Sequence, residues 1–132
     1  MSAKITAMLT SVVVGLALLV PMSAQALNWP EFTREAFQAA QAEDKTILIV
    51  VHADWCTTCR SQEPALEALI LEDQFKDVVA FRVDYDAQKD VMVELEVFNR
   101  STIIVYRGGQ EVARAYAINR IEEIRDLFWL GL

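Results

Sequence analysis

The stretch ADWCTTCR, residues 53–60, contains both cysteines of this 132-residue chain, Cys56 and Cys59. It follows TILIVVH, residues 46–52, a run of mostly β-branched and aliphatic residues without polar alternation. Such a run predicts a strand that is buried on both faces of a sheet. In residues 57–73, apolar side chains recur at three- and four-residue spacing, which predicts a helix. The cysteines therefore lie at a strand-to-helix turn.

Three roles can be weighed for this cysteine pair. A structural disulfide across so short a loop would stabilise the fold by only about 2 kcal/mol, less than a disulfide that joins distant segments. A structural zinc ion takes four Cys or His ligands, and the only histidine, His52, ends the predicted strand and is typical of a core edge. A transient copper or zinc contact stays open. A redox role fits the position best.

The redox interpretation depends on where the helix begins. Cys59 lies one helical turn after Cys56, so the two sulfurs can come within bonding distance. The free N–H groups and the dipole at a helix N-terminus stabilise a thiolate. They lower a cysteine pKa from about 8.5 into a range of about 3.5–7.5. We therefore expect Cys56 to be the attacking thiolate and Cys59 to resolve the mixed disulfide.

Around this turn, the middle of the chain alternates helices and strands. Residues 33–43 predict a helix with Thr33 as its N-cap. Residues 78–84 and 87–98 predict a second strand and a third helix. The inward faces of the first and third helices are formed by apolar residues, namely Phe37, Ala40, Val91, Leu95 and Phe98.

The end of the chain predicts a hairpin and a last helix. Two strand-like runs flank residues 107–110, where Gly-Gly permits the positive φ angles of a tight turn. Asn119 and Glu122 resemble a capping box at the start of a helix. The inward residues of this helix are Ile121, Ile124 and Phe128. The element order predicts an α/β fold with a central mixed sheet flanked by helices.

These features resemble the thioredoxin superfamily. In that family a buried strand leads into Trp-Cys-x-x-Cys, and a helix-kinking proline follows at a fixed spacing; Trp55 and Pro64 hold these positions. The resemblance covers residues 27–132 in element order. The chain is particularly similar to periplasmic thioredoxin-like domains, such as that of the transmembrane thiol reductase. It implies a thiol–disulfide oxidoreductase whose only redox group is the Cys56–Cys59 disulfide. Its implied partners are protein thiols and disulfides, with a membrane thiol reductase as electron donor.

Some residues of the predicted site depart from the family pattern. Ser101 stands where the family has a cis-proline; because a cis bond before a non-proline residue costs about 2.5–4 kcal/mol, we expect a trans loop of different shape. Val50 stands where the family has a buried acid, so this position carries no carboxyl group. Thr57 and Thr58 lie between the two cysteines, at the positions that mainly set the redox potential in the family. They are either tolerated first-turn residues or they tune the thiolate of Cys56. Trp55, Thr57, Thr58 and Ser101 are predicted to shape the site.

These departures leave an alternative of a different class. The chain could be a non-enzymatic binding module of the thioredoxin fold, such as a copper chaperone that uses Cys56 and Cys59, or an adaptor that docks a partner protein. The main interpretation assigns no metal site. It leaves open whether the protein acts as reductant, oxidant or isomerase.

The N-terminus has the layout of a secretory signal peptide. Lys4 precedes an apolar run over residues 5–20, and the small-x-small pattern of residues 24–26 predicts cleavage after Ala26. The run is shorter than the roughly 20 residues that a membrane-spanning helix needs, although an uncleaved anchor is the alternative. The sequence therefore predicts a signal peptide, 1–26, and one thioredoxin-like domain, 27–132, in the periplasm.

Charge and composition restrict the partners further. The formal net charge is −7, with acidic and basic residues interspersed. This pattern is typical of a solvated surface and argues against nucleic acid, which binds to basic patches. We expect a monomer that contacts the membrane only through the signal segment, if that segment is uncleaved.

Overall fold

A computed structural model describes residues 29–132, so the predicted signal peptide and its cleavage site lie outside the described residues. The sheet consists of β1 (Thr46–His52), β2 (Val79–Asp84), β3 (Thr102–Arg107) and β4 (Gln110–Tyr116). The helices are α1 (Arg34–Ala42), α2 (Thr57–Ile70), α3 (Lys89–Glu94) and α4 (Ile121–Trp129), with the 3-10 turn η1 (Asp73–Phe75) after α2. This order confirms the predicted α/β fold with a mixed sheet.

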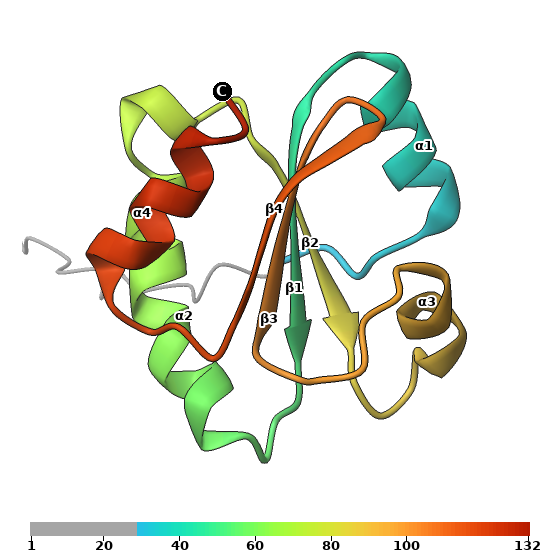
Figure 1. Cartoon of the computed structure of the whole chain (residues 1–132), viewed down its shortest axis with the longest axis vertical. Coiled ribbons are helices and arrows are strands. Elements are labelled where there is room, and N and C mark those ends of the chain that lie inside the picture. Colours follow the sequence, from blue (N-terminus) through green and yellow to red (C-terminus); the bar gives the residue numbers. More distant parts are fainter. Residues whose placement is uncertain (1–28) are drawn as a thin grey trace, which may run out of the picture.

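The four strands form one sheet in the order β2-β1-β3-β4. β1 pairs with β2 in parallel and with β3 antiparallel, and β3 pairs with β4 through the hairpin. Figure 1 shows α2 and α4 on one face of this sheet and α1 and α3 on the other. Because β1 lies in the middle and is covered on both faces, its side chains from Ile47 to His52 are all buried.

Each face of the sheet has its own hydrophobic core. On the α1 and α3 side, Ile47, Ile49 and Val51 of β1 pack with residues such as Phe32 and Phe81. On the α2 and α4 side, the alternate residues of β1 pack with the apolar faces of those helices. The alternation of side chains along a strand divides β1 between the two cores. Both cores therefore fix the end of β1, where the cysteine turn begins.

Two local predictions are wrong. Helix α3 ends at Glu94, and Glu96 has a positive φ of 51°, so the predicted helix stops before Phe98. Phe98 is 72% exposed instead of lying on an inward helix face. The capping box is also absent, because the N-cap of α4 is Arg120 without a side-chain bond, and Asn119 donates its amide to Ser61 Oγ instead.

Helix α2 ends at Ile70, before its predicted end at residue 73, and the remaining local predictions hold. Thr33 is the N-cap of α1 and accepts a hydrogen bond from the Ala36 N–H at 3.2 Å. Pro64 lies within α2, and the β3–β4 turn contains Gly108 with φ of 51°. Within residues 29–132, no helix has both the length and the apolar character that crossing a bilayer requires.

Candidate active site

Cys56 is the N-cap residue of α2. Its backbone is extended (φ −83°, ψ 112°), and its sulfur accepts a hydrogen bond from the Cys59 N–H at 3.2 Å. The Cys56 N–H closes the preceding turn by donating to the Ala53 carbonyl at 3.0 Å. The sulfur therefore takes the place that a Ser or Asp side chain usually has at a helix start, where free N–H groups and the dipole favour negative charge.

The hydroxyl of Ser101 lies between the two thiols. Ser101 Oγ is 3.1 Å from Cys56 Sγ and 3.1 Å from Cys59 Sγ. All three residues are buried, with exposed fractions of 3% for Cys56, 1% for Cys59 and 2% for Ser101. Residues 45 and 42 positions apart in the sequence thus form one compact cluster of two sulfurs and one oxygen.

The backbone holds Ser101 in place from several sides. Its N–H donates to the Val51 carbonyl at 2.8 Å, and its carbonyl accepts from the Ala117 N–H at 3.0 Å and from Gln62 Nε2 at 3.1 Å. No cis peptide bond occurs in residues 29–132, so this loop is trans, as its sequence predicts. Ser101 has a φ of 59°, a left-handed conformation that is unfavourable for residues other than glycine. Two hydrogen bonds from the backbone and one from the Gln62 side chain maintain it here.

The environment separates the pKa values of the two thiols. Burial raises the pKa of Cys56, but hydrogen bonds from the Cys59 thiol, the Ser101 hydroxyl and the Cys59 N–H, together with the nearby Arg100, outweigh it. The pKa of Cys56 falls to about 7 from an ordinary 9.0. Burial and the hydrogen bond to Cys56 raise the pKa of Cys59. At neutral pH the site can therefore hold one thiolate, at Cys56, and one thiol, at Cys59.

Trp55 and Arg100 form the rim of the site. Trp55 is 55% exposed and donates its indole N–H to Asp86 Oδ2 at 2.7 Å. The Arg100 guanidinium lies 4.9 Å from the centre of the Trp55 ring, in a cation–π arrangement. Tyr85 packs edge-on against the same ring. Trp55 directly precedes Cys56 in the chain, and its indole is held by Asp86, Arg100 and Tyr85. Its role in shaping the site stays a prediction.

Thr57 and Thr58 lie in the first turn of α2. Thr57 is exposed and Thr58 is half-buried. The groups that lower the pKa of Cys56 are Cys59, Ser101 and Arg100, and neither threonine is among them. Both interpretations of the two threonines place them in this first turn, and whether they tune the thiolate of Cys56 stays a prediction.

Val50 stands at the position of the family's buried acid, and Asp54 is an acidic residue next to the cysteine turn in the sequence. Val50 is buried in the core on the α2 side, and the Asp54 side chain is fully solvent-exposed. His52 is buried, with its ring nitrogens 3.4 Å from Asp54 Oδ1 and 3.7 Å from Glu63 Oε1. Among residues 29–132 no cluster of three or more His, Cys, Asp or Glu side chains could hold a metal ion.

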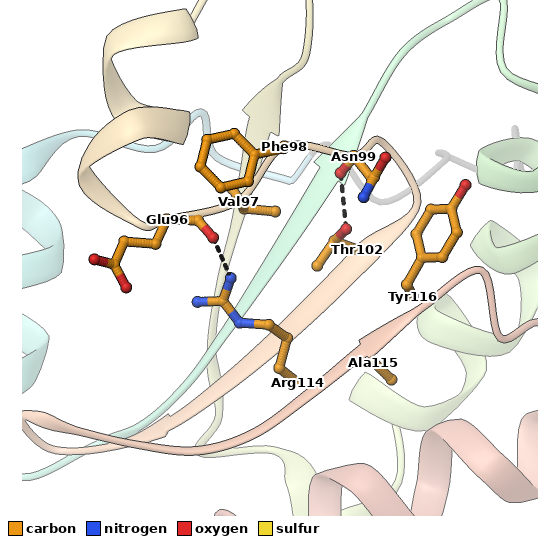
Figure 2. A pocket seen from close by; sticks show the side chains of 8 residues that line it. All are labelled: Glu96, Val97, Phe98, Asn99, Thr102, Arg114, Ala115 and Tyr116. Carbon is orange, nitrogen blue, oxygen red and sulfur yellow. Dashed lines mark hydrogen bonds between the residues drawn. The ribbon is translucent and has the colours of Figure 1, made fainter.

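A pocket of about 320 Å³ adjoins the loop that carries Ser101. Figure 2 shows the residues that line this pocket. Among them, the Thr102 hydroxyl donates to the Asn99 carbonyl, and the Arg114 guanidinium donates to the Glu96 carbonyl. The rings of Phe98 and Tyr116 line this pocket and are 72% and 55% exposed. Two exposed aromatic rings thus lie at a pocket next to the loop that carries Ser101.

Sequence reasoning misses two residues of this site. Arg100 contributes to the acidity of Cys56, and the one signal for it in the sequence is its position directly before Ser101. Gln62 is fully buried in α2 and donates Nε2 to the carbonyls of Ser101 and Ile118. A glutamine on the apolar side of a helix is an anomaly that could have marked it, since buried polar groups need partners.

Comparisons with known proteins agree with this geometry. The thioredoxin family model matches residues 28–128. The chain is 35% identical to thioredoxin H-type of Fagopyrum esculentum over 70% of this chain and 78% of that protein. It is 33% identical to mouse thioredoxin over 67% and 84%. Among solved structures, Trxlp from Edwardsiella tarda superposes with a TM-score of 0.73 and 34% identity, covering 75% of this chain and 96% of that one.

Proposed function

The chain belongs to the thioredoxin family, whose members are thiol–disulfide oxidoreductases, and from this premise we propose that it is an exported enzyme that exchanges electrons with protein disulfides through Cys56 and Cys59. The observation that carries the proposal is the difference in acidity between the two thiols. The pKa of Cys56 is about 7, and that of Cys59 is raised. One sulfur is therefore ready to attack while the other stays protonated in reserve.

The proposed reaction has two steps. The Cys56 thiolate attacks a sulfur of the substrate disulfide, so that a mixed disulfide forms and the first substrate thiolate leaves. Cys59 then loses its proton and attacks Cys56 Sγ, which releases the second substrate sulfur as a thiol. The protein ends with a Cys56–Cys59 disulfide, and two electrons have moved to the substrate. The same steps in reverse oxidise a substrate dithiol.

Protein substrates suit the surface around the cysteines. Trp55, Phe98 and Tyr116 present exposed rings, and aromatic side chains are enriched in protein contacts. Both sulfurs are nearly buried, so a substrate disulfide must be pressed closely against the rim to be reached. We propose that these three exposed rings supply this contact.

Export and the electron donor are proposed from the N-terminal segment. Residues 1–26 have the layout of a signal peptide, which would deliver the domain to the periplasm. A membrane thiol reductase is the proposed donor there, because the resting pair must be reduced again after each turnover. With that donor the enzyme works as a reductant.

The reaction is tested with two single-cysteine variants in a disulfide-reduction assay. We expect Cys56→Ser to abolish reduction, because the attacking thiolate is gone. Cys59→Ser should instead accumulate a mixed disulfide on Cys56, detectable by mass spectrometry. Full activity of Cys56→Ser would contradict the mechanism.

Export is tested by expressing the full chain in a Gram-negative host and fractionating the cells. We expect a periplasmic protein that begins at Leu27. In cells without a membrane thiol reductase, the Cys56–Cys59 pair should accumulate oxidised, as read by thiol labelling. Recovery of the chain from the cytoplasm with an intact N-terminus would refute export.

A further inference from the structure

Ser101 supplies a hydroxyl that contacts both reacting sulfurs. Its Oγ is 3.1 Å from each of Cys56 Sγ and Cys59 Sγ, and either atom of each pair can donate. A hydroxyl can accept one hydrogen bond while it donates another. Ser101 can therefore accept the Cys59 proton and donate its own at the same time.

The resolving step requires such a group. Cys59 is a thiol at neutral pH, because its pKa is raised, and it must lose its proton to attack. Its exposed fraction is 1%, so bulk water has little access to the sulfur. Beyond the Cys56 sulfur and Ser101, the polar neighbours described for Cys59 Sγ are backbone groups, namely the Val51 carbonyl at 3.9 Å and the Ala53 backbone, which hydrogen-bonds to the sulfur and cannot accept its proton. A backbone carbonyl cannot take up the proton at this pH.

No carboxylate is available beside Cys59 in residues 29–132 to act as the base. Val50 packs into the apolar core beneath the site, and the Asp54 side chain points into solvent. Glu63 is engaged by Arg82 at 2.8 Å and lies 3.7 Å from His52 Nδ1. Ser101 is thus the protic side chain in contact with the resolving thiol.

We propose that Ser101 is a catalytic residue whose hydroxyl relays the proton of the Cys59 thiol to the substrate sulfur that leaves in the resolving step. This inference rests on the proposed function, since it refines the second of its two steps. Three hydrogen bonds to the Ser101 backbone hold this residue in place beside both cysteine sulfurs.

The relay balances in atoms and electrons. Cys59 gives its proton to Ser101 Oγ as its sulfur forms a bond to Cys56 Sγ. The bond between Cys56 Sγ and the substrate sulfur breaks, and that sulfur takes the pair of electrons. Ser101 gives its own proton to the departing sulfur, which leaves as a thiol. Ser101 returns to a neutral hydroxyl, and no other acid or base is consumed.

The test uses Ser101→Ala and Ser101→Gly, with Ser61→Ala as the control. Both Ser101 variants remove the hydroxyl, but glycine also relieves the positive φ of 59°, so a folding defect in the alanine variant would not recur in the glycine variant. Ser61 is an exposed serine of α2 whose hydroxyl binds the Thr58 carbonyl. Acid quenching and mass spectrometry separate the mixed disulfide from the fully oxidised protein, so each step has its own rate.

Two readouts distinguish a relay from a structural role. The first readout compares two leaving thiols. A nitrobenzoate thiol is acidic and leaves without a proton, whereas cysteamine is not acidic enough to do so. We expect both Ser101 variants to slow resolution by about 100-fold with cysteamine, in the range of general acid–base catalysis, and far less with the nitrobenzoate thiol. The second readout is pH: resolution should become proportional to hydroxide in the variants, rising about tenfold per pH unit.

The inference is overturned if both variants resolve at the wild-type rate. It is also overturned if they slow both leaving thiols equally with an unchanged pH profile, because that would be a packing effect. The same experiment gives the rate of the first step, the formation of the mixed disulfide, which is divided by the fraction of Cys56 that is ionised. If wild-type protein forms no mixed disulfide at all, the proposed function fails; if it forms normally and only resolution is insensitive to Ser101, the relay alone fails.

Discussion

At the scale of single residues, burial and hydrogen bonds shift the pKa of Cys56 in opposite directions. Removing the sulfur from water disfavours its charge. The Cys59 thiol and backbone N–H and the Ser101 hydroxyl all donate toward it, and together with Arg100 they bring its pKa to about 7. The pKa of Cys59 is raised instead, first by burial and then by the hydrogen bond that its thiol donates to Cys56. One network therefore makes the first thiol acidic and keeps the second protonated.

Arg100 is the cationic member of that network, so we expect Arg100→Ala to raise the pKa of Cys56. The alkylation rate of Cys56 by iodoacetamide at neutral pH should fall about threefold, in keeping with a single partly screened charge. Arg60 is the matched control, because it is an exposed arginine of α2 that does not contribute to the pKa of Cys56. An equal loss in Arg60→Ala would show that net charge, and not this contact, sets the acidity.

The sequence predicts Cys56, Cys59 and Ser101 as site residues but not the contacts between them. Cys56 and Cys59 follow from a local pattern, because a strand-to-helix turn and a helical spacing are short-range features. The placement of Ser101 between their sulfurs depends on pairing between β1 and β3, which lie about fifty residues apart in the chain. Arg100 and Gln62 act only through this long-range arrangement. They are therefore the residues that pattern reasoning misses.

At the scale of elements, periodicity predicts where helices and strands form better than where they end. The strand over residues 46–52 and the N-cap at Thr33 are predicted with their observed bounds. The third helix is predicted too long, because Phe98 falls at a helical spacing from Leu95 and Val91. The positive φ of Glu96 ends that helix, and Val97 then becomes the buried residue instead. A backbone conformation of this kind leaves no apolar pattern to read.

The β3–β4 hairpin depends on the first of its two glycines. Gly108 has a φ of 51° and its N–H donates to the Lys45 carbonyl at 2.8 Å, whereas a Cβ added at Gly109 would meet nothing within 4 Å. We expect Gly108→Ala to lower the free energy of unfolding by about 1–2 kcal/mol, from left-handed strain and contact with Asp44. Gly109→Ala is the control and should change it by less than about 0.5 kcal/mol. Urea denaturation measures both, and equal losses would contradict this account of the turn.

At the scale of the whole molecule, the site forms where three distant segments meet at one end of the sheet. The cysteine turn follows β1, the Ser101 loop precedes β3, and Ala117 follows β4 (Figure 1). The Ser101 N–H donates to the Val51 carbonyl, and the Ala117 N–H donates to the Ser101 carbonyl, so these two bonds join the three segments. Because the low pKa of Cys56 exists only when they are together, ionisation of this thiol is linked to folding.

That linkage predicts how the stability of the reduced protein varies with pH. The folded pKa of Cys56 is about 7, below its ordinary value of 9.0, so its contribution is present in alkaline solution and is lost as pH falls through about 7. Relative to reduced Cys56→Ser, the free energy of unfolding of the reduced wild type should rise by about 2 kcal/mol between about pH 6 and pH 8.5. The free energy of unfolding of the reduced wild type itself should fall again above about pH 9, because the unfolded chain then ionises Cys59 while the fold, which raises the pKa of Cys59 by burial and by its hydrogen bond to Cys56, resists it. Urea denaturation across this range measures the difference, and the oxidised protein, which has no thiols to titrate, should lack the rise. A flat difference between wild type and Cys56→Ser would mean that the thiolate is no better stabilised in the fold than in the unfolded chain.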